Sequence, residues 1–528
     1  MITVNAVKLE VFKHLFQAVA EEMGETLRRT SHSPNIKERR DYSCAIFDAD
    51  GKTIAQAEHM PVHLGSMPQS VAEALKQFTL QPGDAVILND PYHGGTHLPD
   101  ITVVEGVFVD GYEDSVFYVA NRAHHADVGG ISPGSLPIAT EIFQEGLIIP
   151  PILLKQQGAM NDGVLQLILR NVRTPEERLS DLSAQLAANR VGIRRLLSYI
   201  RDHGLQTVTA YARGLQDYAE RVTRSLIEDI PDGTYRYEDF LDDDGQGTHH
   251  IPIRVTIEIN KDHATVDFSD SADQVAGSVN AVRAITVSAT FYAFRAVVDE
   301  EIPSNEGGFR PLTIITRPGT IVDATMPAAV AGGNVETSQR IVDVVLGALA
   351  QALRRKIPAA GQGTMNNLTL GGVDQRDISH PRAVAYYETI GGGAGAGPTW
   401  DGVSGVHVHM SNTMNTPIEA LERELPLRVR RYQIWRKSGG GGKFKGGDGI
   451  IRTYEFLCPM TVTLLSERRE QGPYGLAGGE GGKPGEAWLT TIHSKTSTKL
   501  PGKWHGNIHT GDVLEIRTPG GGGWGKKD

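Results

Sequence analysis

The first part of the chain contains both helix-like and strand-like patterns of apolar residues. Apolar residues between Val7 and Met23 recur every three to four positions, which predicts an amphipathic helix. Another helix is expected at about 68–78. Four short apolar runs bounded by polar or glycine-containing segments predict strands: 42–47, 85–90, 101–109 and 115–124. Residues 175–227 carry helical stripes throughout, so paired helices should end an N-terminal α/β region near residue 230.

The pattern changes beyond residue 230. Residues 251–259 and 263–269 alternate apolar and polar positions, as half-buried antiparallel strands do. Helices are expected at about 281–298 and 336–353. From about residue 390 glycine runs dominate, with strands between them. We therefore expect a mixed α/β (α+β) fold of several subdomains: 1–230 (α/β with a helical segment), 231–385 (β-rich with inserted helices) and 386–528 (glycine-rich β).

Composition narrows the functional classes. The 528 residues include 60 glycines but only two cysteines, Cys44 and Cys458, so a disulfide framework is excluded and a reducing compartment is indicated. The formal net charge of −11 argues against nucleic acid as a partner. No run approaches the ~18 consecutive apolar residues of a membrane span, and the N-terminus lacks a signal-peptide pattern. We expect a cytoplasmic protein without a membrane segment.

Histidine and aspartate side chains are concentrated in residues 89–127. They include Asp90, His93, His97, Asp100, His124, His125 and Asp127. His97 and Asp100 precede one predicted strand and His124 ends the next, so antiparallel pairing would bring them together. Imidazole and carboxylate ligands suit Zn, Mn or Fe(II). The alternative is that these side chains hydrogen-bond to the backbone at strand ends, but their density and the flanking glycines favour a metal site.

Three weaker candidates lie outside this stretch. Asp41 could add a carboxylate to the site, although the residues alone favour a surface ion pair with Arg39 or Arg40. Glu141 and Glu145 have the spacing of one helical turn, which fits either a shared pocket or a solvated helix face. His407 and His409 alternate, so they should face one side of a strand, as ligands, as substrate contacts or on a polar sheet face.

The glycine runs do not form a known nucleotide motif. Lys443 and Lys483 follow glycines, but neither precedes the Ser or Thr that a P-loop requires. No G-x-G-x-x-G follows a strand in an N-terminal βαβ unit. Tight turns and close backbone crossings therefore explain the runs best, and this chain is not expected to bind ATP itself.

Seven sequence segments together resemble the hydantoinase B/oxoprolinase family. They are NIKERRDYSCAIFD, NDPYHGGTHLPD, NRAHHADVGGISPGS, EIFQEGLIIPP, GGNVETSQR, HMSNTMNTPIEALE and SGGGGKFKGGDGI. The resemblance runs from about residue 5 to residue 525. It implies a metal-dependent subunit of an ATP-dependent hydrolase that opens a small cyclic amide, such as a hydantoin, 5-oxoproline or a lactam.

The resemblance also implies partners and site residues. A hydantoinase A-type ATPase subunit would bind ATP and phosphorylate the carbonyl oxygen of the substrate, within a heterotetramer or larger assembly. The family's metal ligands fall on Asp41, His97, Asp100 and His124, and the ion would be Zn, Mn, Fe or Mg. Catalytic roles are expected for Asp41, Asp100 and His124.

Two other functions remain open. Acetone carboxylase-type subunits share these motifs, so a ketone carboxylase is the alternative enzyme, although such chains are usually longer. A glycine-rich β scaffold that only binds and stabilises an ATPase partner is the non-enzymatic alternative, and it predicts no stoichiometric metal.

Overall fold

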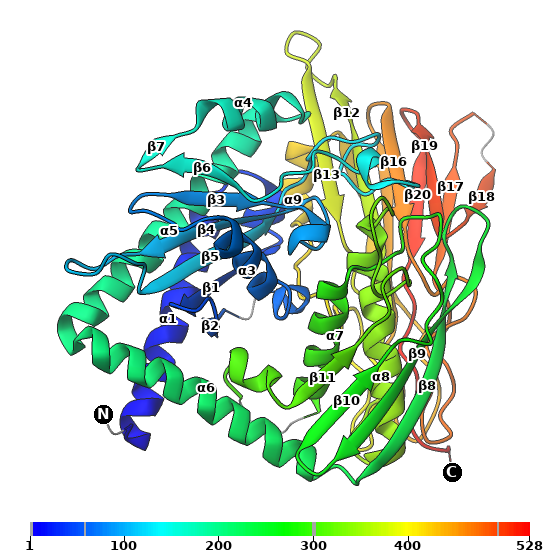
Figure 1. Ribbon diagram of the computed structural model, residues 1–528. Helices are drawn as coiled ribbons and strands as arrows, with labels where there is room; N and C mark the ends of the chain where they lie inside the picture. The colour runs from blue at the N-terminus through cyan, green and yellow to red at the C-terminus, as the bar shows by residue number, and fades with distance from the viewer. Residues whose placement is uncertain (1–3, 58–59, 298–301, 494–495, 528) are drawn as a thin grey trace.

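The computed structural model describes residues 4–57, 60–297, 302–493 and 496–527 of the chain. These residues form four β-sheets with helices packed on and between them, which confirms the mixed α/β class. Figure 1 shows the first sheet on one side of the molecule and the C-terminal strands on the other, with α7 and α8 between them. The division at residues 230 and 385 stays a prediction.

The first sheet has seven antiparallel strands in the order β2-β1-β5-β4-β3-β6-β7. The bounds are β1 Tyr42–Asp48, β2 Thr53–Gln56, β3 Ala85–Leu88, β4 Asp100–Val107, β5 Phe117–His124, β6 Ile152–Gln156 and β7 Ala159–Met160. All four predicted strands are present and differ by at most two residues at either end. Every residue of β1 and β4 is buried, because helices cover both faces of the sheet.

Five helices surround this sheet: α1 Ala6–Thr30, α2 Pro34–Lys37, α3 Met67–Gln77, α4 Asp162–Arg170 and α5 Pro175–His203. α5 packs against α1, β4 and β5, while α3 contacts β3, β4 and β5. The predicted helical stretch 175–227 is divided at Gly204, whose φ of 81° ends α5 before α6 (Leu205–Glu228) begins. This pairing of long helices is the one expected from the sequence.

The second sheet has the order β11-β10-β9-β8. Its strands are β8 Gly233–Asp243, β9 His249–Asn260, β10 His263–Asp267 and β11 Leu312–Ile315. β9 pairs antiparallel with β8 and β10, as predicted for β9 and β10, and β11 runs parallel to β10. Along β9, buried isoleucine and valine residues alternate with more exposed residues, so the apolar side chains all face inward. β8 was not predicted.

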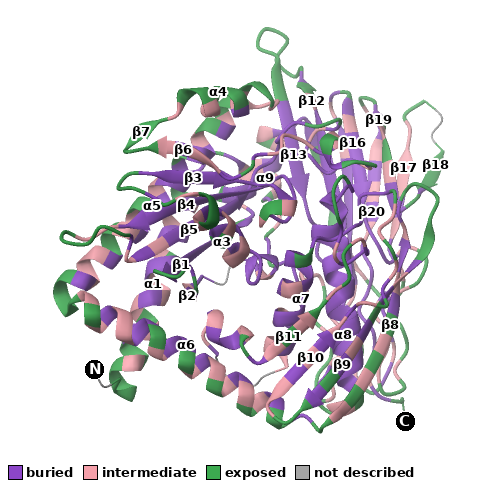
Figure 2. Cartoon of the chain, in the orientation of Figure 1, coloured by how far each residue is buried: buried purple, intermediate pink, exposed green. Residues whose placement is uncertain are grey.

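Two central helices lie next to the second sheet. They are α7 Arg283–Ala296 and α8 Ser338–Ala352, and α8 follows directly on η5, a π-helix at Gly333–Thr337. The last position predicted for α7, residue 298, lies outside the described residues. α8 packs against α7, β8 and β9 and is buried from Ser338 to Ala350, as Figure 2 shows in purple. A helix that is buried all round belongs to the centre of the molecule.

The C-terminal strands form two more antiparallel sheets, ordered β13-β12-β16-β19 and β14-β15-β20-β17-β18. The bounds are β12 Asn367–Asp374, β13 Arg382–Glu388, β14 Leu427–Trp435, β15 Gly449–Phe456, β16 Met460–Leu465, β17 Glu486–Thr490, β18 Ser497–Leu500, β19 Lys503–Ile508 and β20 Val513–Arg517, with α9 at Ile418–Glu424. The glycine runs lie mostly outside these strands and pack main chain on main chain. A Cβ on Gly521, for example, would lie 2.0 Å from the carbonyl oxygen of Ala394.

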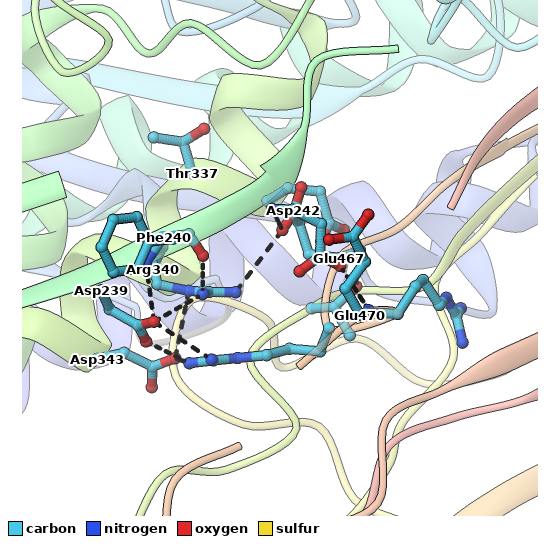
Figure 3. A network of polar contacts seen from close by, with 12 residues as sticks. Asp239, Phe240, Asp242, Thr337, Arg340, Asp343, Glu467 and Glu470 are labelled. Carbon is cyan, nitrogen blue, oxygen red and sulfur yellow. Dashed lines mark hydrogen bonds and ion pairs between the residues drawn. The ribbon is translucent and has the colours of Figure 1, made fainter. Parts of the chain in front are cut away.

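A buried network of charged side chains joins the second sheet, α8 and the C-terminal region (Figure 3). The guanidinium of Arg468 lies 2.6 Å from Oδ2 of Asp239 on β8 and 2.7 Å from Oδ2 of Asp343 on α8. Arg340 on α8 lies 3.3 Å from Asp239 and 3.7 Å from Glu467. Since both arginines are almost fully buried, these pairs fix how the regions meet.

Candidate metal centre

Strand register brings three of the predicted ligands together. Asp100 is the first residue of β4 and pairs with His124, the last residue of β5. His97 lies three residues before Asp100. Oδ1 of Asp100 is 3.2 Å from Nε2 of His97 and 3.2 Å from Nδ1 of His124. Within the described part of the chain, these three residues, which we call the His–Asp cluster, form the one such group whose donor atoms lie within 4.8 Å of one another.

The loop that carries His97 is folded back on the end of β3. The Nδ2 atom of Asn89 donates to the carbonyl of Leu98 at 2.7 Å, and its Oδ1 accepts from the amide of Ile149 at 2.6 Å. Gly95 lies where a Cβ would come within 2.5 Å of the carbonyl oxygen of Asn89, so a side chain does not fit there. The glycine of the sequence motif is therefore required by the close return of the loop.

Neighbouring groups orient the donor atoms of the cluster. The hydroxyl of Thr96 donates to Oδ2 of Asp100 at 2.8 Å, and Nε2 of His63 lies 3.4 Å from the same oxygen. Nδ1 of His97 is 3.4 Å from the carbonyl of Ala331, which can only accept. A proton on Nδ1 would satisfy this carbonyl and leave the lone pair of Nε2 for a cation.

The cluster is buried and electrostatically coupled. His97, Asp100 and His124 are each no more than 2% exposed. Burial alone would raise the pKa of Asp100, but the charges of His97 and His63 and hydrogen bonds from His124 and His63 hold it well below its usual range. Burial lowers the pKa of His124, although Asp100 and Asp41 oppose the shift. A carboxylate flanked by imidazole nitrogens is a donor set that can bind a divalent cation.

Two side chains from outside the N-terminal region touch the cluster. Asn334, in η5, places Nδ2 3.0 Å from Nε2 of His97. Tyr387, on β13, stacks on His124 with ring centroids 4.6 Å apart. Sequence analysis assigned no role to either residue, nor to Thr96 or His63. Two of these residues lie in motifs that the sequence analysis quotes: Thr96 in NDPYHGGTHLPD and Asn334 in GGNVETSQR.

Asp41 lies beside the cluster. It precedes β1 directly, and its carbonyl accepts a 3.0 Å hydrogen bond from the amide of His124. Its carboxylate is buried, and its Oδ2 lies 3.9 Å from the guanidinium of Arg39. Both the ion pair and a place next to the expected ligands are therefore present, and its role as a fourth ligand stays a prediction.

Two of the weaker sequence interpretations are wrong. Glu141 is exposed, whereas Glu145 is buried and accepts hydrogen bonds from the amides of Val330 and Ala331, so the glutamates share neither a pocket nor a helix face. The helix between them is a three-residue 3-10 turn.

His407 and His409 do not lie on a strand. Their segment is a loop in which His409 adopts a φ of 55°. His407 pairs with Ser411 at 3.1 Å, and Nε2 of His409 lies 3.5 Å from Oδ1 of Asp343. Alternation in the sequence therefore does not place the two rings on one face.

Other polar residues of the 89–127 stretch have structural partners. His93 contacts Asp90 at 2.7 Å, His125 contacts Gln185 at 3.0 Å, and Asp127 accepts from Arg173 at 2.8 Å. The stretch thus contains both a cluster suited to a cation and the hydrogen-bonding residues that hold its loops.

Comparison with known proteins identifies the family. The model of the family described as Hydantoinase B/oxoprolinase matches residues 5–527. The chain belongs to this family. The resemblance inferred from seven sequence segments is thereby confirmed over nearly the whole chain.

Relatives of the chain differ in length. 5-Oxoprolinase 1 of Arabidopsis thaliana is 41% identical over 550 residues, which cover 99% of this chain but 42% of that protein. A putative D-/L-hydantoinase subunit of Pseudomonas sp. (strain NS671) is 30% identical over 543 residues, which cover 99% of this chain and 90% of that protein. The chain thus spans about two fifths of the length of the oxoprolinase relative.

Two solved structures share the fold. ATP-dependent caprolactamase from Pseudomonas jessenii superposes with a TM-score of 0.91 at 29% identity, covering 99% of this chain and 92% of that chain. A chain of acetone carboxylase superposes with a TM-score of 0.88 at 18% identity, covering 98% and 75%. The second likeness is one of fold alone.

None of the helices among the described residues is long and apolar enough to cross a membrane.

Proposed function

We propose that this chain is the metal-dependent subunit of an ATP-dependent hydrolase that opens a small cyclic amide such as a hydantoin, 5-oxoproline or a larger lactam. The observation that carries the proposal is the buried His–Asp cluster. It occurs in a chain similar to proteins named as a 5-oxoprolinase, a hydantoinase subunit and an ATP-dependent caprolactamase.

The proposed partner is a hydantoinase A-type ATPase subunit, joined with this chain in a heterotetramer or larger assembly. The partner would bind ATP and phosphorylate the carbonyl oxygen of the substrate. The lack of a P-loop in this sequence supports such a division of labour. So does the hydantoinase relative, which is named as a subunit and matches this chain over most of its own length.

The donor set fits a divalent ion such as Zn, Mn, Fe or Mg, held by His97, Asp100 and His124 with Asp41 as the fourth ligand. Such an ion would lower the pKa of a bound water toward ~7. Asp41 or Asp100 orients the water and accepts its proton. Thr96 and His63 keep Oδ2 of Asp100 occupied, so that Oδ1 remains directed at the imidazoles.

The substrate chemistry follows from the activation step. The carbonyl carbon of an amide is a poor electrophile. Phosphorylation of the carbonyl oxygen makes this carbon more electrophilic. Addition of water to the activated carbon, cleavage of the C–N bond and release of inorganic phosphate give the ring-opened product. The cluster is buried, and such a site would exclude other water from a phosphorylated substrate bound there.

The test uses the complex of this chain with its ATPase partner. His97→Ala and Asp100→Ala should abolish ring opening while ATP turnover by the partner partly survives. His93→Ala is the matched control, because His93 lies in the same loop but pairs with Asp90. Unchanged ring opening by metal-stripped protein would overturn the proposal.

Two further measurements separate the alternatives. Product formation that requires bicarbonate would indicate a ketone carboxylase instead of a hydrolase. The absence of stoichiometric metal in purified protein would indicate the non-enzymatic scaffold.

A further inference from the structure

The motif GGNVETSQR brings one segment from the middle of the chain onto the His–Asp cluster. Four contacts hold this segment there. Oε1 of Glu145 accepts from the amides of Val330 and Ala331 at 2.8 and 2.9 Å. The carbonyl of Ala331 faces Nδ1 of His97, and the side chain of Asn334 reaches Nε2 of the same ring. Both nitrogens of His97 are thus contacted by residues 331–334.

The backbone of this segment has an unusual conformation. Residues Gly333–Thr337 form a π-helix, which is rare and occurs frequently at functional sites. Gly333 packs so closely that a Cβ there would lie 1.8 Å from the carbonyl oxygen of Asn280. The hydroxyl of Thr337 donates to the carbonyl of Val279. The glycine and the threonine therefore fix the turn that presents Asn334.

Only one of the two polar atoms of the Asn334 side chain is known to have a hydrogen-bond partner. Asn334 is 4% exposed, and its Oδ1 atom is buried with no hydrogen-bond partner among the described residues. A buried unpaired carbonyl oxygen is costly unless another group takes it up. The neighbouring Nδ2 donates to the lone pair of His97, which is the lone pair that a cation would occupy.

The Asn334 amide and the His97 ring are close enough to bind one ion. Two donor atoms about 2.1 Å from one tetrahedral cation lie about 3.4 Å apart. The Asn334 amide and Nε2 of His97 are 3.0 Å apart. A cation on His97 leaves Nδ2 without an acceptor, and a half-turn of the amide places Oδ1 at the same position.

We propose that the side-chain oxygen of Asn334 is a further ligand of the ion held by the His–Asp cluster, delivered by the π-helix of the GGNVETSQR motif. The inference rests on the proposed metal-dependent function. It means that the metal site is completed by a residue more than two hundred positions from the N-terminal ligands in sequence.

The test measures metal binding and not activity. Metal is first removed with a chelator from three proteins: wild type, Asn334→Ala and Asn334→Asp. Each is then titrated with Co(II) and Zn(II). Calorimetry gives the affinity, and the Co(II) absorption spectrum reports the coordination. The metal affinity of Asn334→Ala should be at least ~10-fold lower than that of wild type, because even residues that only hydrogen-bond to a metal ligand contribute that much. Its Co(II) spectrum should also change. Asn334→Asp should keep or strengthen binding, because a carboxylate oxygen replaces the amide oxygen.

A matched control is Asn305→Ala, since Asn305 is equally buried but bonds to the carbonyl of Leu215. Its metal affinity should equal that of wild type, and unfolding midpoints check that each variant is folded. Equal affinities and spectra in wild type and Asn334→Ala would overturn the inference. So would equal losses in Asn334→Ala and Asn334→Asp with an unchanged spectrum, the behaviour of a residue that only donates a hydrogen bond to His97.

The two proposals fail in different ways. A wild-type protein that takes up no metal would overturn both. Metal uptake that depends on Asn334, in a complex that opens no ring, would overturn the proposed function alone.

Discussion

The hydroxyl of Thr96 donates a 2.8 Å hydrogen bond to Oδ2 of Asp100 and thereby selects the oxygen that faces the two imidazoles. Thr96→Val removes the donor at nearly the same volume. We expect its metal affinity to fall by about 10- to 100-fold, measured by competition with a chromophoric chelator. Thr96→Ser, which keeps the hydroxyl, should bind like wild type, and equally tight binding by the valine variant would contradict the prediction.

Asp41 should be essential although it is also an ion-pair partner of Arg39. Asp41→Asn removes a carboxylate expected to bind the ion or accept a proton, so ring opening should fall by about 100-fold or more. The metal content of Asp41→Asn separates the two roles. If Asp41 is a ligand, the variant should lose the ion; if Asp41 only accepts a proton, the variant should retain it. Asp48→Asn, at the other end of β1, is the control. Wild-type activity in Asp41→Asn would refute both roles.

Glu145 should make stability depend on pH. Burial raises the pKa of Glu145 to about 8 from 4.5, even though the amides of Ala331 and Val330 favour the charged form. Between these pH values the folded chain binds a proton that the unfolded chain has lost. The free energy of unfolding therefore falls as pH rises through this window, by a few kcal/mol in all, on the order of 1.4 kcal/mol per unit.

Glu145→Gln removes this titration while keeping an acceptor for the two amides. Denaturant unfolding at pH 5 and pH 8 should show a smaller decrease in stability for Glu145→Gln than for wild type. Glu141→Gln, at an exposed position, should follow wild type. Parallel pH profiles for wild type and Glu145→Gln would contradict the assignment.

The charged network around Arg468 should respond strongly to the loss of one partner. Arg468→Met leaves the carboxylates of Asp239 and Asp343 buried without their main cation. We expect a loss of about 3–5 kcal/mol in unfolding free energy. Arg431→Met, which removes an ion pair with Glu515 at a half-exposed site, should cost less than about 1 kcal/mol. Equal losses in the two variants would contradict this account.

The proximity of the three residues of the His–Asp cluster could be predicted because it depends on strands that are adjacent in the sequence. His97, Asp100 and His124 lie at the ends of strands that follow one another closely, so adjacent pairing was enough to bring them together. Asn334 and Tyr387 could not be found this way. They reach the cluster through packing between distant regions, which no periodicity in the sequence records.

The wrong interpretations share a physical origin. Spacing was read as regular structure at Glu141 and Glu145, where the chain makes only a three-residue turn. The same occurred at His407 and His409, where a left-handed residue breaks the alternation. β8 was missed because its outward face is polar, so few apolar residues mark it as a strand.

The residues around the His–Asp cluster lie far apart in the order of synthesis. His97, Asp100 and His124 leave the ribosome long before Asn334, which contacts His97, and Tyr387, which stacks on His124. The arrangement seen in the folded chain therefore cannot be complete until η5 and β13 have been made and have packed against the N-terminal sheet.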